Sequence, residues 1–277
     1  GREYVLHILT ADGQSFESEP VALRPGPGID SIYTTYQENF SFEDQQMIPG
    51  IQIHINTHPW DSKKEYYLKW DYQETWKIYP KWVSKDFDYK PCWNMDYNNS
   101  VLLANTAEYT ANRLIQYPLV RYSRKSYKFF EGYSILVSQY SLNYSAYQFW
   151  KMVEESSREN GSIFDNVPYN PSSNIYCCDD KKTRVFGYFA AAGVDQKRAY
   201  FEPPLHGLDF TSYYSYCDCN FYVTKIPLYY NSTRPEFSYV LWEDYALNDL
   251  AYTFKKKCLD CRVFSTTTEK PPFWNYD

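Results

Sequence analysis

A strict alternation of apolar and polar side chains over residues 50–58 constrains the fold more than any other feature. Ile51, Ile53 and Ile55 fall on one face, and the residues between them are polar. Side chains alternate between the two faces of a β-strand, so this pattern predicts a strand with one buried face. Residues 66–78 are expected to form a second strand with its aromatic side chains directed inward. We predict that these two strands pair with each other.

Further strand-like segments are spread along the chain. They cover residues 100–104, 133–140, 183–190 and 199–201. Short strands at this spacing are typical of a β-sandwich. The sequence therefore predicts a mainly β fold, a β-sandwich-like large domain with helical insertions.

The first 24 residues have the pattern of a β-hairpin. Residues 4–9 and 15–23 are strand-like and flank an Asp12-Gly13 turn. One hairpin is not a stable domain, so we predict that residues 1–24 are the C-terminal hairpin of an N-terminal β-sandwich domain whose earlier strands precede Gly1. The Pro- and Gly-rich residues 25–31 are expected to be a linker, which leaves 32–277 as the large domain.

The clearest predicted helix covers residues 143–159. Its aromatic and apolar residues recur at near-helical spacing, Ser141 or Asn143 can cap its start, and Asn160-Gly161 can end it. A second, short helix is expected over residues 239–254. Residues 161–174 and 203–236 are predicted to be long loops, where binding residues are often found.

The composition excludes some classes of function and favours a secreted protein. The net charge is −6 with no basic block, which argues against nucleic-acid binding. No apolar run approaches the roughly 18 residues that a membrane-spanning helix needs. Tyrosine makes up 31 of the 277 residues, a bias that fits an exported protein better than a cytosolic one.

Seven cysteines suggest cross-links. Most occur in short-range pairs: Cys177-Cys178, Cys217 with Cys219, and Cys258 with Cys261. Such clusters indicate disulfides, buried free thiols or a structural zinc site. We favour disulfides, with Cys217 or Cys219 bonded to Cys258 or Cys261, while Cys92 stands alone.

No group of residues has the spacing of a catalytic or metal site. His54 and His58 lie about 13 Å apart on a strand and cannot share an ion. Carboxylate pairs occur at Asp71 with Glu74, Asp179 with Asp180, and Glu243 with Asp244, and they are interpreted as solvated charges. No serine or cysteine lies in a nucleophile elbow. We therefore expect neither enzymatic activity nor a cofactor.

Aromatic residues after Glu202 are the best candidates for a binding surface. Tyrosine combines an apolar ring with a polar tip and is favoured at protein interfaces and on sugar- or peptide-binding platforms. The candidate interface residues are Tyr213, Tyr214, Tyr216, Tyr229 and Tyr230.

Blocks along nearly the whole chain resemble, in order, the Bacteroidota outer-membrane lipoproteins of the family called domain of unknown function 4249. These blocks are residues 4–13, 16–20, 29–33, 50–57, 66–76, 92–93, 133–150, 161–165, 168, 174–175, 187–189, 197–198, 258–261 and 270–274. The motifs Gln73–Trp76 and Gly187–Phe189 within them are interpreted as packing and turn positions.

The resemblance implies a lipid-anchored protein on the extracellular face of the outer membrane, with its lipidated cysteine upstream of Gly1. It implies that residues 1–24 end an amino-terminal Ig-like or carboxypeptidase-regulatory-like β-domain. It also implies a SusC-like TonB-dependent barrel as partner. We therefore expect an accessory subunit of such a transporter that helps to capture a peptide or glycan, or to assemble the complex. The alternative is a structural subunit of a larger outer-membrane secretion or barrel-assembly machine. A third possibility, an enzyme acting on surface polysaccharide, would require two carboxylates converging in a cleft.

Overall fold

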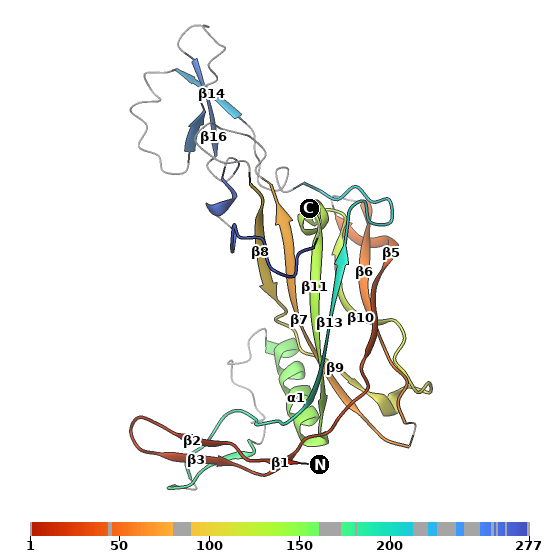
Figure 1. The fold of residues 1–277 in the computed structure, drawn as a ribbon, viewed down its shortest axis with the longest axis vertical. Helices are drawn as coiled ribbons and strands as arrows, with labels where there is room; N and C mark the ends of the chain where they lie inside the picture. Colours follow the sequence, from red (N-terminus) through yellow and green to blue (C-terminus); the bar gives the residue numbers. More distant parts are fainter. Residues whose placement is uncertain are drawn as a thin grey trace.

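The fold was examined in a computed structural model of the 277-residue chain. The structure describes residues 2–43, 46–61, 63–79, 90–160, 173–180, 182–212, 221–225, 237–240, 250–255, 258, 260–263 and 265–275. Two antiparallel sheets face each other in this part of the chain, which confirms the predicted mainly β, sandwich-like fold (Figure 1).

The smaller sheet of the sandwich has three strands. They are β5 (Ile29–Glu43), β6 (Gln46–Thr57) and β10 (Tyr117–Ser123), with β6 in the middle. Ile51, Ile53 and Ile55 are fully buried, as their alternation predicts. The strand β5 begins at Ile29, so the last residues of the segment 25–31, predicted to be a linker, belong to this strand.

The larger sheet has five strands. They are β7 (Tyr67–Ile78), β8 (Cys92–Tyr97), β9 (Leu102–Asn105), β11 (Tyr133–Leu142) and β13 (Gly193–Phe201). Their order is β13-β11-β7-β8, and β9 pairs with β7 beyond the end of β8. Two 3₁₀ turns, η1 (Thr106–Glu108) and η2 (Tyr127–Phe129), lie in the connections.

The predicted pairing of residues 50–58 with 66–78 is wrong, because β6 and β7 belong to different sheets. Their apolar faces pack against each other instead. Ile53 and Ile55 share one core with Trp70 and Trp76. Two amphipathic strands can bury their apolar side chains either by pairing or by facing each other, and alternation alone does not distinguish these arrangements.

The edges of the two sheets are joined where β5 begins. The Ile29 amide donates a hydrogen bond to Asp195 Oδ2 of β13 at 2.6 Å, and Lys197 Nζ donates to the Asp30 carbonyl at 2.7 Å. Inside the sandwich, Trp70 Nε1 donates to Gln139 Oε1 at 2.8 Å. These polar contacts close one side of the sandwich and satisfy a buried indole N–H.

The helix α1 (Tyr144–Asn160) confirms the predicted helix. Asn143 Oδ1 accepts a hydrogen bond from the Ala146 amide at 2.7 Å, as expected for an N-cap. Ala146 and Tyr147 are buried together with Tyr67 of β7. The helix therefore lies on the outer face of the five-stranded sheet, meaning the face turned away from the other sheet.

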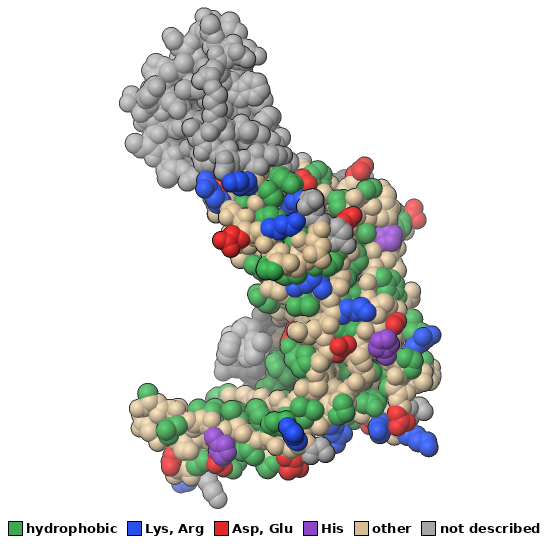
Figure 2. Space-filling model, in the orientation of Figure 1, with side chains coloured by type: hydrophobic (Ala, Val, Ile, Leu, Met, Phe, Trp, Pro, Cys, Tyr) green, Lys and Arg blue, Asp and Glu red, His purple; other side chains and the backbone are tan. Residues whose placement is uncertain are grey.

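The predicted N-terminal hairpin is present and extends sideways from the base of the sandwich (Figure 1). It consists of β2 (His7–Leu9) and β3 (Ser15–Ser18), and β1 (Glu3–Tyr4) pairs with β4 (Val21–Ala22). A third strand, β12 (Ile175–Cys177), pairs with β3. The surface beside this hairpin is hollowed (Figure 2). The division into residues 1–24 and 32–277 remains a prediction.

Two predictions from local pattern are wrong. Residues 183–190 contain no strand. Of the predicted helix 239–254, the described parts belong to the strands β15 (Phe237–Val240) and β16 (Leu250–Lys255), which form a sheet with β14 (Phe221–Lys225). This sheet lies beyond the end of the sandwich (Figure 1). The hydrogen bonds that β16 forms with β14 and β15 outweigh the local preference of these residues for a helix.

The last described segment, residues 265–275, returns to the outer face of the five-stranded sheet after the 3₁₀ turn η3 (Cys261–Val263). Thr267 forms an isolated antiparallel β-bridge with Trp93 of β8. The centroid of the Phe273 ring lies 3.5 Å from the guanidinium carbon of Arg198 in β13. We call residues 265–275 the C-terminal tail. The tail and α1 lie on the same face of the sheet and leave part of it uncovered between them.

Candidate functional site

The uncovered part of the outer face forms a groove of about 580 Å³. Its floor comes from β7, β11 and β13, and its walls come from residues 97–101 and from α1. This volume lies within the range of about 300–1,000 Å³ that is usual for small-molecule sites. We refer to it below as the outer-face groove.

A row of polar side chains crosses the floor of the groove. Strand register aligns Asp71 of β7, Ser138 of β11 and Gln196 of β13. Gln196 Nε2 donates a hydrogen bond to Ser138 Oγ at 2.8 Å. Neighbouring strands are about 4.8 Å apart, so this row spans about 10 Å. It presents both hydrogen-bond donors and acceptors.

Apolar and aromatic side chains border the polar row on both sides. Leu136 and the Tyr97 ring lie on one side. Leu136 is the register partner of Gln73, and Gln73 Nε2 donates a hydrogen bond to the Tyr97 hydroxyl at 2.8 Å. Tyr140 lies on the other side, close to Trp150 of α1. Tyr97 is 68% exposed, so its ring is accessible at the rim.

Lys69 lies at the helical end of the groove and is held in place by aromatic rings and a carboxylate. Its Nζ atom lies 4.6 Å from the Trp150 ring centroid, 5.3 Å from the Tyr140 centroid and 2.5 Å from Asp71 Oδ1. The side chain of Lys69 is 10% exposed. Cation–π contacts and the ion pair together restrict this lysine, so the groove wall is ordered before any ligand arrives.

The second wall of the groove is formed where the chain passes from β8 to β9. Both strands pair with the same edge of β7, and residues 98–101 leave the sheet between them. Asn98 bridges the gap, because its Oδ1 accepts from the Tyr72 amide at 2.7 Å and its Nδ2 donates to the Ser100 carbonyl at 2.8 Å. The asparagine thereby replaces a missing ladder bond and fixes the wall.

A second polar group lies inside the sandwich. Glu74 is 3% exposed, which contradicts its interpretation as a solvated charge. Its Oε1 atom accepts hydrogen bonds from the hydroxyls of Tyr122 and Tyr133, and its Oε2 atom accepts from Lys128 Nζ at 2.7 Å. Burial is the main cause that raises the pKa of Tyr122 and of Tyr133, followed by the charge of Glu74. Both hydroxyls therefore remain donors at neutral pH.

Glu74 lies on the inner face of the sheet, whereas Asp71 lies in the groove. The two carboxylates therefore do not converge. Acid–base catalysis by a pair of carboxylates would need both in one cleft. Asp71 is half-exposed and paired with Lys69. Asp179 and Asp180 are exposed, and Asp179 accepts from the Ser15 amide at 2.8 Å. Glu243 and Asp244 lie outside the described residues.

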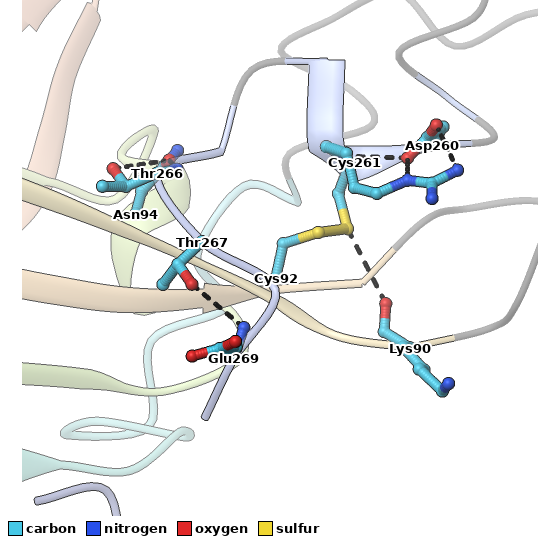
Figure 3. Close-up of a disulfide and its surroundings, with 9 residues drawn as sticks. Lys90, Cys92, Asn94, Asp260, Cys261, Thr266, Thr267 and Glu269 are labelled. Atoms are coloured by element: carbon cyan, nitrogen blue, oxygen red, sulfur yellow. Dashed lines mark hydrogen bonds and ion pairs between the residues drawn. A yellow bond between two sulfur atoms is a disulfide. The ribbon is translucent and has the colours of Figure 1, made fainter. Parts of the chain in front are cut away.

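A disulfide joins Cys92 of β8 to Cys261 of the η3 turn, which precedes the C-terminal tail (Figure 3). In the predicted bond between Cys217 or Cys219 and Cys258 or Cys261, the Cys261 alternative is therefore excluded, whereas the Cys258 alternative stays a prediction; Cys92 does not stand alone. Cys258 is also disulfide-bonded. Both Cys92 and Cys261 are buried. The tail is also held to β8 by the β-bridge between Thr267 and Trp93 and by the Thr266 amide, which donates a hydrogen bond to Asn94 Oδ1 at 2.8 Å.

Among the described residues, the free cysteines and the histidines form no joint site. Cys177 and Cys178 are free, the first buried and the second exposed. His54 Nε2 lies 2.8 Å from Thr35 Oγ1, and His58 lies 3.6 Å from Asp30. Within the described ranges, His, Cys, Asp and Glu side chains form no group of three that could hold a metal ion. No helix in those ranges has the length and apolar character needed to span a membrane.

The predicted interface lies outside the described residues. It comprises Tyr213, Tyr214, Tyr216, Tyr229 and Tyr230, and the candidate cysteines Cys217 and Cys219 lie outside as well. Sequence reasoning missed the groove, since Gln73 was interpreted as a packing position. The available signal is the alternation of Lys69, Asp71 and Gln73 with the inward-directed aromatic residues of β7, which places these polar side chains on the opposite face of the strand.

Comparison with known proteins assigns the chain to a protein family. A family model described as a domain of unknown function (DUF4249) matches residues 1–198, which include the hairpin, both sheets of the sandwich up to Arg198, and α1. No curated protein and no solved structure matches the chain. The match covers well over half of the sequence, so the chain belongs to the DUF4249 family.

Proposed function

We propose that this protein is a non-enzymatic accessory lipoprotein of a SusC-like TonB-dependent transporter. It holds a ligand at the extracellular face of the outer membrane for uptake by the barrel. The observation that carries the capture role is the outer-face groove, an ordered site with a polar floor and aromatic borders. Concave sites of this composition are typical of ligand binding.

The disulfides support a location outside the cytoplasm. Disulfides persist in oxidising compartments and are rare where thiols are kept reduced. The Cys92–Cys261 bond closes 169 residues of sequence separation, and Cys258 is oxidised as well. This oxidation state fits a chain that folds after export and is then anchored at the cell surface.

The proposed barrel partner rests on the resemblance to outer-membrane lipoproteins and on the aromatic segment after Glu202. The rings of Tyr213, Tyr214 and Tyr229 would be buried against the extracellular face of the barrel. Tyrosine is among the residues that most often carry the binding energy of an interface. In this proposal the groove holds the ligand and the aromatic segment holds the partner.

A deletion strain separates this proposal from a structural role in a secretion or barrel-assembly machine. An accessory subunit is dispensable for barrel insertion, so quantitative proteomics of the outer membrane should find unchanged amounts of TonB-dependent barrels. A general loss of assembled barrels in the deletion strain would contradict the accessory role and favour the structural one.

A further inference from the structure

We propose that the outer-face groove binds a short neutral carbohydrate, with Asp71, Ser138 and Gln196 contacting hydroxyl groups and Tyr97 contacting a sugar ring. This inference rests on the proposed capture role and names the class of ligand captured. Three properties of the groove support it: its charge, the pairing of its floor strands, and its mixture of donors and acceptors.

The groove carries no net charge among its described lining residues. Lys69 and Asp71 are the charged residues that line it, and they pair at 2.5 Å. The lysine is further enclosed by Trp150 and Tyr140. Releasing either charge to a ligand would leave its partner unpaired at a partly buried position, which is costly. A neutral ligand leaves the pair intact.

The two central strands of the floor, β7 and β11, cannot add a peptide as a further strand. β-Augmentation needs an exposed edge with free backbone groups. The strand β7 is paired with β11 on one side and with β8 and β9 on the other, and β11 lies between β7 and β13. Both strands that form the centre of the floor therefore offer side chains only. A ligand here must be recognised through its own side groups, as a sugar is.

The side chains of the floor match hydroxyl groups. A hydroxyl both donates and accepts, and so do Ser138 and the amide group of Gln196, whereas the Asp71 carboxylate accepts. These residues are aligned in one row, so consecutive hydroxyls of a single ligand can reach them. The accessible ring of Tyr97 lies at the rim, where the apolar face of a sugar ring can pack against it.

Titration calorimetry of the purified full chain tests the proposal. The probes are four neutral trisaccharides, namely maltotriose, cellotriose, mannotriose and xylotriose, with trigalacturonic acid as an anionic counterpart and tri-asparagine as a neutral peptide. At least one neutral trisaccharide should bind more tightly than both comparators. Failure of all four to bind, or tighter binding of either comparator, would overturn the proposal.

A matched pair of double variants locates the binding. Tyr97→Ala with Gln196→Ala removes one rim ring and one floor amide, and should weaken binding about tenfold or more, equivalent to about 1.4 kcal/mol. Tyr36→Ala with Gln46→Ala changes the same residue types at exposed positions on the other sheet, and should leave the Kd within about twofold. Equal binding by both double variants would exclude the groove as the site.

These measurements are separate from the test of the barrel partner. If the unaltered chain binds no sugar while the barrel still co-purifies, the groove inference fails and the accessory role stands. Sugar binding without a barrel would mean the reverse. The thermal unfolding midpoint of each variant is measured as a control, because it distinguishes a loss of binding from a loss of fold.

Discussion

Lys128 Nζ donates a hydrogen bond of 2.7 Å to Glu74 Oε2 inside the sandwich, and so joins the η2 turn to β7. The same ammonium group lies 4.5 Å from the Trp76 ring centroid. With the hydroxyls of Tyr122 and Tyr133 on the other carboxylate oxygen, Glu74 connects three strands and a turn. The network satisfies its buried polar groups mutually, so its members depend on one another.

Replacing Glu74 should therefore destabilise the fold strongly. Glu74→Ala removes the acceptor of two hydroxyls and the nearer carboxylate of Lys128, whose second partner Asp96 lies at 3.7 Å, and should lower the free energy of unfolding by about 3 kcal/mol. Glu74→Gln keeps an acceptor oxygen and should cost less. Urea unfolding at pH 7 measures both. Equal stability of wild type and Glu74→Ala would refute the network as a structural element.

The Cys92–Cys261 bond should contribute to stability by attaching the C-terminal tail. Replacing both cysteines by serine should cost about 2–5 kcal/mol, since the bond constrains a long loop in the unfolded chain. Guanidinium unfolding under non-reducing conditions gives the value. Cys178→Ser is the control, because this thiol is free and exposed. A double variant as stable as the control would be inconsistent with this account.

Glu131 should make stability depend on pH. Burial raises its pKa above the ordinary value of 4.5, and Lys77 opposes this in part. The folded state therefore holds the proton more tightly than the unfolded state, so the stabilising contribution is complete below pH 4.5 and lost as pH rises through the raised pKa. Glu131→Gln stays neutral and should be the more stable form at pH 7, by less than about 1 kcal/mol because the group is half-exposed.

Urea titrations of wild type and Glu131→Gln at pH 7 and pH 4 check this sign. The two proteins should differ at pH 7 and converge at pH 4. Glu202→Gln changes an exposed carboxylate near the same end of the sandwich and serves as the control. A Glu131→Gln protein less stable than wild type at pH 7 would reverse the argument.

The aromatic segment after Glu202 should hold the partner. The triple variant Tyr213→Ala, Tyr214→Ala and Tyr229→Ala should reduce co-purification with the barrel about tenfold or more, because interface tyrosines commonly contribute over 1 kcal/mol each. Label-free mass spectrometry of the pull-down measures this. Undiminished recovery of the barrel would show that the interface lies elsewhere.

Local patterns in the sequence predict the elements that local forces determine. The hairpin follows from Asp12-Gly13, where Gly13 adopts a positive φ of 88°, and α1 follows from its apolar spacing and the Asn143 cap. Long-range relations are not encoded locally. The facing of β6 and β7, the Cys92–Cys261 bond and the burial of Glu74 each depend on segments far apart in the chain.

The groove was missed for the same reason. Its floor residues Asp71, Ser138 and Gln196 are distant in sequence and become neighbours only through strand register. An outward polar residue on one strand looks like an ordinary solvent-facing position. Three such residues form a site only once α1 and residues 97–101 provide walls around them.

The central claim is that this chain works as a subunit of a transporter. It is tested most directly by a mild-detergent pull-down from the native outer membrane, with quantitative mass spectrometry of the recovered proteins. We predict a TonB-dependent barrel in near-equal amount to the bait. Recovery of the chain alone, or together with secretion or assembly components, would contradict the claim.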